Sequence, residues 1–194
     1  MVDKMERPQN SIKILAFAGS LRRDSYNKAL INTAKELAPD KVDVEIFDLS
    51  GIPLFNQDEE SSMPEKVRIF KKKIEEADAI LIATPEYNRS VPGVLKNAID
   101  WASRPRGNNS FNDKPVAVMG ATGGQVIGTY GAQAHLMNIF SYLNMHVLEK
   151  PQLFIAGASE KISGGKVIDD ATRELIGELM RSIERWTRRL TQQQ

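Results

Sequence analysis

Short runs of apolar residues alternate with longer amphipathic segments along the whole chain. The apolar runs predict strands over residues 12–18, 42–47, 79–83 and 115–120, with the last extended pieces at 146–148 and 153–156. Helical spacing predicts helices that begin near Ser25, at Pro64, at Pro92 and after Gly128. A last helix carries the predicted apolar stripe of Leu175, Leu179, Ile183, Trp186 and Leu190.

This alternation of strands and helices, without repeats or linkers, is typical of an α/β protein. Right-handed crossovers turn such a series into a parallel sheet with helices on both faces. A closed eight-stranded barrel needs about 250 residues, and the chain has 194. The sequence therefore predicts one α/β domain over residues 1–194, a three-layer sandwich on a five-stranded, parallel, doubly wound sheet. The polar residues 1–11 are expected to form a flexible N-terminal segment.

The composition excludes several kinds of chemistry and partner. The chain has no cysteine and two histidines, which excludes disulfides, cysteine nucleophiles and histidine-rich metal sites. A net charge of +1 gives no overall field that would attract nucleic acid. The N-terminal segment lacks the apolar core of a signal peptide, and no apolar run approaches the ~18 residues that span a bilayer. We expect a cytoplasmic protein that binds neither nucleic acid nor membrane.

Residues 19–27, after the first predicted strand, are the first candidate for a binding site. Ligands of doubly wound sheets bind beyond the carboxyl ends of the strands, and a helix N-terminus favours phosphate. The candidate phosphate ligands are Ser20, Arg22, Ser25 and Asn27. Neither a dinucleotide fingerprint nor a P-loop is present, which favours the phosphate of a mononucleotide. The alternative, that Ser25 only caps the helix, is equally compatible with the sequence.

Two further loops follow predicted strands. Residues 85–93 contain two prolines and Tyr87, so a flat ring could lie against a stiff backbone there; a rigid connection with a surface tyrosine is the alternative. Residues 120–128 are rich in glycine, which permits close approach of the backbone to a ligand, although a flexible turn would also explain them. Taken together, the three loops favour a flat, nucleotide-like heterocycle, and flavin mononucleotide (FMN) fits best.

Residues 19–22 with 25–27, and the longer and more specific stretch 85–101, resemble the NADPH-dependent FMN reductase family, which includes soluble quinone, chromate and azo-dye reductases. The resemblance extends roughly over residues 12–186. It implies a flavodoxin-like fold, noncovalent FMN, and NADPH or NADH as co-substrate. It also implies a small-molecule electron acceptor and a homodimer or homotetramer.

The resemblance assigns roles to matching residues. Ser20, Arg22, Ser25 and Asn27 would hold the FMN phosphate; Pro85, Glu86, Tyr87 and Asn88 would line the isoalloxazine and the ribityl chain; and Thr122, Gly123 and Gly124 would contact the ring. No catalytic side chain is expected, because the flavin carries the electrons. The implied activity passes hydride from NAD(P)H through FMN to quinones, free flavin, azo compounds or chromate. The alternatives are a flavodoxin-like electron carrier, a class that is usually strongly acidic, and a flavin-binding regulatory protein.

Other residues give weaker expectations. The helix from Pro92 carries an apolar stripe of Val94, Leu95, Ala98 and Trp101, which predicts a subunit interface unless the stripe packs on the sheet. Arg89, Arg104 and Arg106 are candidates for contact with the 2′-phosphate of NADPH. The run 71–73 of lysines is expected on a solvated helix face. His135 is expected to be structural.

Overall fold

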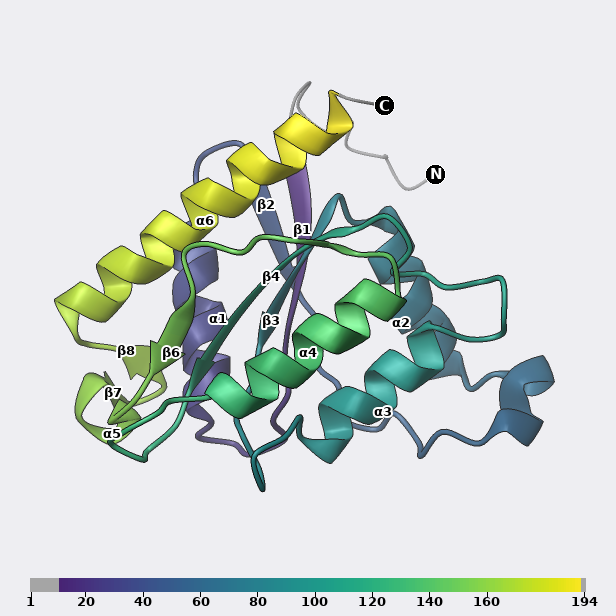
Figure 1. The fold of residues 1–194 in the computed structure, drawn as a ribbon, viewed down its shortest axis with the longest axis horizontal. Helices are drawn as coiled ribbons and strands as arrows, with labels where there is room; N and C mark the ends of the chain where they lie inside the picture. The colour runs from purple at the N-terminus through teal and green to yellow at the C-terminus, as the bar shows by residue number, and fades with distance from the viewer. Residues whose placement is uncertain (1–10, 193–194) are drawn as a thin grey trace, which may run out of the picture.

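The computed structural model describes residues 11–192 and contains the predicted parallel sheet (Figure 1). The strands lie in the order β2-β1-β3-β4-β5, and every neighbouring pair in this order is parallel. Their bounds are β1 Ile12–Ala18, β2 Val42–Ile46, β3 Ala79–Ala83, β4 Pro115–Ala121, β5 His146–Val147 and β6 Leu153–Ile155. All but the last residue of the predicted flexible segment 1–11 lie outside the described residues.

The helices form one layer on each face of the sheet. In Figure 1 the sheet lies between α1 and α6 on one side and α2, α3 and α4 on the other. Their bounds are α1 Tyr26–Glu36, α2 Glu65–Glu76, α3 Gly93–Ala102, α4 Tyr130–Tyr142 and α6 Asp170–Thr191; the shorter elements are η1 Gln57–Ser62, α5 Ala158–Lys161, β7 Ile162–Ser163 and β8 Lys166–Val167. Of the helices in the described residues, none combines the length and apolar character needed to span a bilayer.

The side chains of β1 explain why both faces are covered. Ile12, Ile14 and Ala16 lie in the core that α1 and α6 share with the sheet, whereas Leu15 and Phe17 lie in the core under α2, α3 and α4. Successive side chains of a strand point to opposite faces, so a nearly continuous apolar run needs a helix layer on each side. The predicted three-layer α/β sandwich is confirmed.

The fifth strand is in two pieces. β5 pairs with the first residues of β4, and β6 pairs with its last residues. Pro151 lies in the connecting segment and has no N–H to donate to a ladder. The two extended pieces predicted from the sequence are therefore one interrupted edge of the sheet.

Lys71 does not lie on a solvated helix face as predicted. Its side chain is buried, and its ammonium group donates to the carbonyls of Ala102 (3.0 Å), Arg104 (2.8 Å) and Asn108 (2.8 Å). Burial lowers the pKa of Lys71, and the nearby Glu75 carboxylate opposes that effect by raising it. The lysine thereby holds the end of α3 and the segment that follows it against α2.

The predicted interface stripe of α3 is also corrected. Leu95, Ala98 and Trp101 are fully buried, and Leu95 and Ala98 belong to the core between the sheet and α2, α3 and α4. These side chains are therefore not available to a second subunit. In α6 the predicted stripe residues Leu179 and Ile183 are buried together with Ile176 and Met180, whereas the predicted stripe residue Leu175 is exposed. In both helices the spacing of apolar residues predicted a helix correctly, but it did not predict which part of the protein the apolar face packs against.

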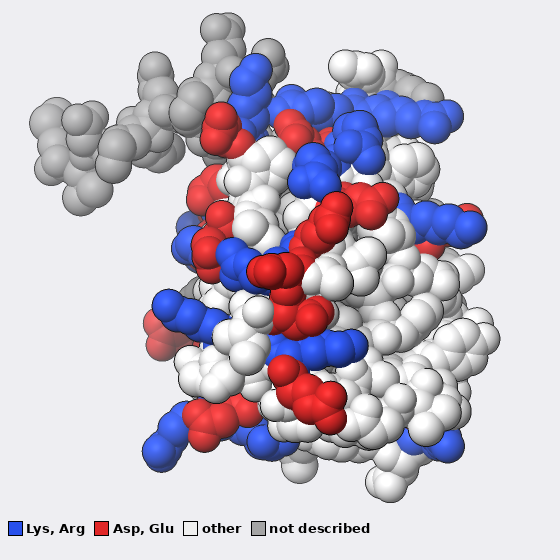
Figure 2. Space-filling view, turned by 90° about the vertical axis from the view of Figure 1, so that its left-hand side faces the viewer, with Lys and Arg blue, Asp and Glu red and all other residues white. Residues whose placement is uncertain are grey.

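Charge is distributed unevenly over the helices. The side of the molecule formed by α1 and part of α6 is covered with interspersed basic and acidic side chains (Figure 2). By contrast, α4 contains no lysine, arginine, aspartate or glutamate, although Tyr130 and Tyr142 at its two ends are 58% and 86% exposed. Exposed helix faces in solvated proteins are normally polar or charged. The outer surface of α4 is therefore unusual for this molecule.

Candidate functional site

Three loops meet at the carboxyl edge of the sheet: the first loop (residues 19–25), the second loop (84–92) and the third loop (122–129). The winding of the sheet reverses between β1 and β3, so the first and second loops flank the position where doubly wound folds bind ligands. Gly19 brings them together, because its N–H donates to the Ala83 carbonyl (2.8 Å) and a Cβ there would lie 3.1 Å from Leu95 and Pro92.

Asn27 joins the first loop to the third. Its amide oxygen accepts from the Ala121 N–H and its amide nitrogen donates to the Ala121 carbonyl, both at 3.0 Å, and the side chain is buried. The side chain thus supplies the two hydrogen bonds that a neighbouring strand would give to the end of β4. These two bonds use one of the two N–H groups of the amide, and contact of Asn27 with a phosphate stays a prediction.

The start of α1 offers hydrogen-bond donors to an anion. Ser25 occupies the N-cap position but its side chain makes no capping hydrogen bond in the described structure, which contradicts the alternative that it serves only as a cap. The first helical hydrogen bond runs from Ala29 to the Ser25 carbonyl (3.1 Å), so the N–H groups of residues 26–28 precede it. The first turn contains no acidic residue. This end of the helix suits a phosphate.

Ser20 and Arg22 lie beside that helix start. The Ser20 hydroxyl accepts from the Arg22 N–H (3.4 Å), and the exposed Arg22 guanidinium lies 5.8 Å from the centre of the Tyr26 ring. In the described residues its one hydrogen bond is a long contact of 3.5 Å to the Asp24 carbonyl. The guanidinium is therefore available to a ligand.

The third loop is fixed at its base and exposed at its tip. The Thr122 N–H donates to Ile155 and its carbonyl accepts from Ala158, both at 3.0 Å, while its hydroxyl accepts from the Gly124 N–H (3.4 Å). Gly123 and Gly124 are exposed, and Gly123 lies against the Tyr26 ring. The Gly124 backbone is also bonded, since its carbonyl accepts from the Gly157 N–H (2.9 Å), so among these three residues of the described loop Gly123 has the backbone that can be offered to a ligand.

Close packing at the end of β4 also sets the third loop against the second. A Cβ on Gly120 would overlap the Thr129 hydroxyl and the Thr84 carbonyl. Only glycine allows the strand to end between these two groups. Gly19 and Gly120 thus allow the second loop to pack against the first and the third at positions that have little or no room for a side chain.

The second loop contains a strained tight turn. Tyr87 and Ser90 exchange backbone hydrogen bonds of 3.2 and 3.0 Å, and the two residues between them, Asn88 and Arg89, have φ of 52° and 63°. Two successive left-handed residues are typical of a type I′ turn. The turn displays Tyr87, Asn88 and Arg89 to solvent.

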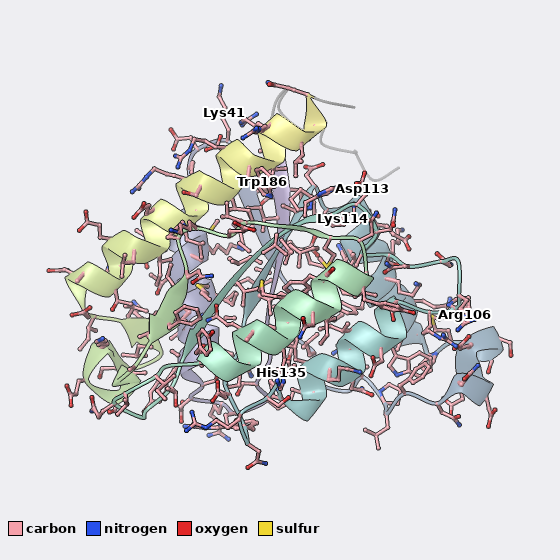
Figure 3. The ribbon with its side chains drawn as sticks, viewed as in Figure 1. Lys41, Arg106, Asp113, Lys114, His135 and Trp186 are labelled. Atoms are coloured by element: carbon pink, nitrogen blue, oxygen red, sulfur yellow. The ribbon has the colours of Figure 1, made fainter. Side chains whose placement is uncertain are left out.

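Two side-chain contacts hold this turn to α4. The Glu86 carboxylate accepts from the Ala132 N–H (3.0 Å) in the first turn of the helix, where a negative charge is favourable. The Ser90 hydroxyl lies 2.9 Å from Nδ1 of His135, which Figure 3 shows on α4 at the carboxyl edge of the sheet. Sequence reasoning missed this pair because nothing in the spacing of residues 90 and 135 relates them.

These contacts refine the predicted ring-binding set. The Glu86 side chain is turned to α4, and Pro85 is buried, with its carbonyl accepting from the Thr84 hydroxyl (2.8 Å). Their side chains anchor the loop, and the surface open to a ligand comes from the turn beyond them. In the part of the chain that the structure describes, no cluster of acidic or histidine side chains is suited to a metal ion.

Comparison with known proteins shows the family of this chain. The family description "NADPH-dependent FMN reductase" matches residues 12–160. An NAD(P)H-dependent FMN reductase of Pseudomonas aeruginosa is 45% identical over 183 residues, which cover 93% of this chain and 98% of that protein. A 2-hydroxy-1,4-benzoquinone reductase of a Burkholderia species is 42% identical over 92% of this chain and 97% of its own length.

A solved structure extends the similarity to three dimensions. The flavoenzyme FerB of Paracoccus denitrificans, described as an NAD(P)H:(acceptor) oxidoreductase, superimposes with a TM-score of 0.84 at 36% identity and covers 92% of this chain and 98% of its own. The flavodoxin-like fold, the oxidoreductase class and the use of FMN with NAD(P)H predicted from the sequence are confirmed. The chain belongs to the NADPH-dependent FMN reductase family.

Proposed function

We propose that FMN binds across the three loops and that the protein transfers hydride from NAD(P)H to quinones. One observation carries this proposal. The uncapped N-terminus of α1 lies at the same end of the sheet as the exposed parts of the second and third loops. Ser20, Arg22, Ser25 and the first N–H groups of α1 hold the phosphate. Tyr87 and Asn88, with the backbone of Glu86, face the ring and ribityl chain, and Thr122, Gly123 and Gly124 close the other side.

The chain's own part in the reaction is to bind and orient. Bound FMN supplies a ring that accepts a hydride and passes it on. The overall reaction consumes one NAD(P)H, one quinone and one proton and yields NAD(P)⁺ and hydroquinone. Backbone N–H groups of the second and third loops stabilise negative charge at the ring edge. The proton comes from solvent, since the site is open.

Quinone is proposed as the acceptor because the Burkholderia relative is described as a benzoquinone reductase. The description of FerB, an NAD(P)H:(acceptor) oxidoreductase, names no particular acceptor. Azo compounds and chromate are further acceptors of the same open site. An electron carrier without nicotinamide chemistry fits less well, because its usual strong acidity is absent from a chain of net charge +1. One domain over residues 1–194 and a cytoplasmic location stay predictions from the sequence.

We expect NADPH to bleach the visible flavin absorption of the FMN-loaded protein under anaerobic conditions, and a benzoquinone added afterwards to restore it. The reason is that both substrates must reach the same ring. Reduction by dithionite but not by NADPH or NADH would contradict the enzymatic function and favour the electron carrier.

Replacement of Arg22 by alanine should raise the dissociation constant of FMN about tenfold. This is near the low end of the effect expected for losing a hydrogen bond to a charged group, because the guanidinium is exposed and the interaction is screened by salt. The loss is limited because Ser20, Ser25 and the helix N-terminus still bind the phosphate. Titration followed by flavin fluorescence measures it. The matched control is Arg23→Ala, which should bind FMN as the wild type does; equal losses in both variants would contradict a specific contact of Arg22.

We further propose a homodimer, itself able to pair into a tetramer, across the uncharged surface of α4. This replaces the interface predicted on α3, whose stripe packs on the sheet. The exposed Tyr130 and Tyr142 and the lack of charge on α4 support an isologous contact between two copies, in contrast to the charged face of Figure 2.

Tyr142→Glu should shift the protein toward monomer, because it places a charge on a helix that carries no charged residue of its own. Light scattering at micromolar concentration measures the change. Ile168→Glu is the control, since Ile168 is 59% exposed and lies just before α6. A wild-type protein that is already monomeric, or a Tyr142→Glu variant that keeps its assembly, would refute an α4 interface.

A further inference from the structure

We propose that Arg89 recognises the 2′-phosphate of NADPH and so makes the protein prefer NADPH to NADH. The inference rests on the proposed function, because it assumes that the hydride donor binds at the three loops. It addresses which nicotinamide cofactor is used, which family membership leaves open.

The structure separates the three candidate arginines. Arg104 is paired with Glu60 at 2.6 Å, and its carbonyl is held by Lys71. Arg106 lies beyond the far end of α3, beside η1 and well away from His135, as Figure 3 shows. Arg89 alone of the three lies in the second loop, at the carboxyl edge where the ligand site is.

The backbone at Arg89 is unfavourable for an arginine. Its φ is 63°, at the second central position of a type I′ turn, where glycine is the usual residue. A side chain in the left-handed region carries a backbone cost that glycine avoids. Packing does not offset this cost, because the Arg89 side chain is 76% exposed. A strained, exposed and charged residue beside a binding site indicates a role for the side chain.

The charge of Arg89 remains largely available to a ligand. The one ion pair that the structure gives it is with Glu86 at 3.8 Å, and that carboxylate already accepts from the N-terminus of α4. A guanidinium binds a phosphate monoester through two parallel hydrogen bonds. Arg22 lies in the first loop with the proposed FMN phosphate, so Arg89 in the second loop is placed for a second phosphate on the incoming substrate.

The test compares ligands that differ only in the 2′-phosphate. Calorimetric titration of the FMN-loaded protein with 2′,5′-ADP and with 5′-AMP should show tighter binding of 2′,5′-ADP. In Arg89→Ala the ratio of the two affinities should fall about tenfold, as for the loss of a hydrogen bond to a charged group. The ratio of kcat/KM for NADPH to that for NADH should fall by the same factor, and Arg89→Lys should restore part of it.

Two further variants separate recognition from folding. Arg89→Gly removes the guanidinium but suits the left-handed backbone, so it should melt at or above the wild-type temperature while losing the preference for the 2′-phosphate. Arg106→Ala, the matched exposed arginine at the other end of α3, should keep that preference.

The inference is overturned if the wild type binds the two nucleotides equally or binds neither, if Arg89→Ala keeps the wild-type ratio, or if Arg106→Ala loses it. Equal reduction of the flavin by NADPH and NADH would overturn the role of Arg89 and leave the proposed function intact. Failure of both nicotinamides to reduce the flavin would instead overturn the proposed function.

Discussion

The pairing of the Asn27 amide with the backbone of Ala121 is the constraint on which the site depends. It fixes the start of α1, where a phosphate can bind, to the end of β4, where the glycine-rich loop begins. Loss of the amide would leave a buried N–H and carbonyl without partners, at roughly 1–3 kcal/mol each. Glu86 makes a comparable tie between the second loop and α4. With both ties in place, the three loops are held at fixed positions on a rigid sheet.

In this arrangement side chains hold the loops in place, and the backbone of the loops is left to contact a ligand. The side chains of Asn27, Glu86 and Pro85 point into the protein and hold the loops, while Gly123 and residues 87–89 of the tight turn are exposed. Fixed dipoles at the edge of a flavin stabilise its reduced, negatively charged form without reorganisation. On the proposed function, such a site needs no acid or base of its own and can serve more than one acceptor, in line with relatives named as a benzoquinone reductase and an FMN reductase.

The fold, and the meeting of the three candidate loops at the carboxyl edge of the sheet, could be predicted from the sequence, because continuous apolar runs and loops at strand ends have local signals. The roles of individual side chains could not. Asn27 pairs with a residue 94 positions away, and Lys71 bonds to the carbonyl of the last residue of α3 and to two carbonyls beyond it, so neither contact leaves a pattern in sequence. The stripe of α3 was compatible with the sheet and with a second subunit, and only the packing decided between them.

The most direct test of a site shared by three loops is amide hydrogen exchange of the protein with and without FMN. Binding should slow exchange together at residues 20–28, at 86–89 and at 123–125, because one ligand contacts all three segments. Protection confined to one of these segments, or centred on residues 103–109 at the far end of α3, would contradict the account.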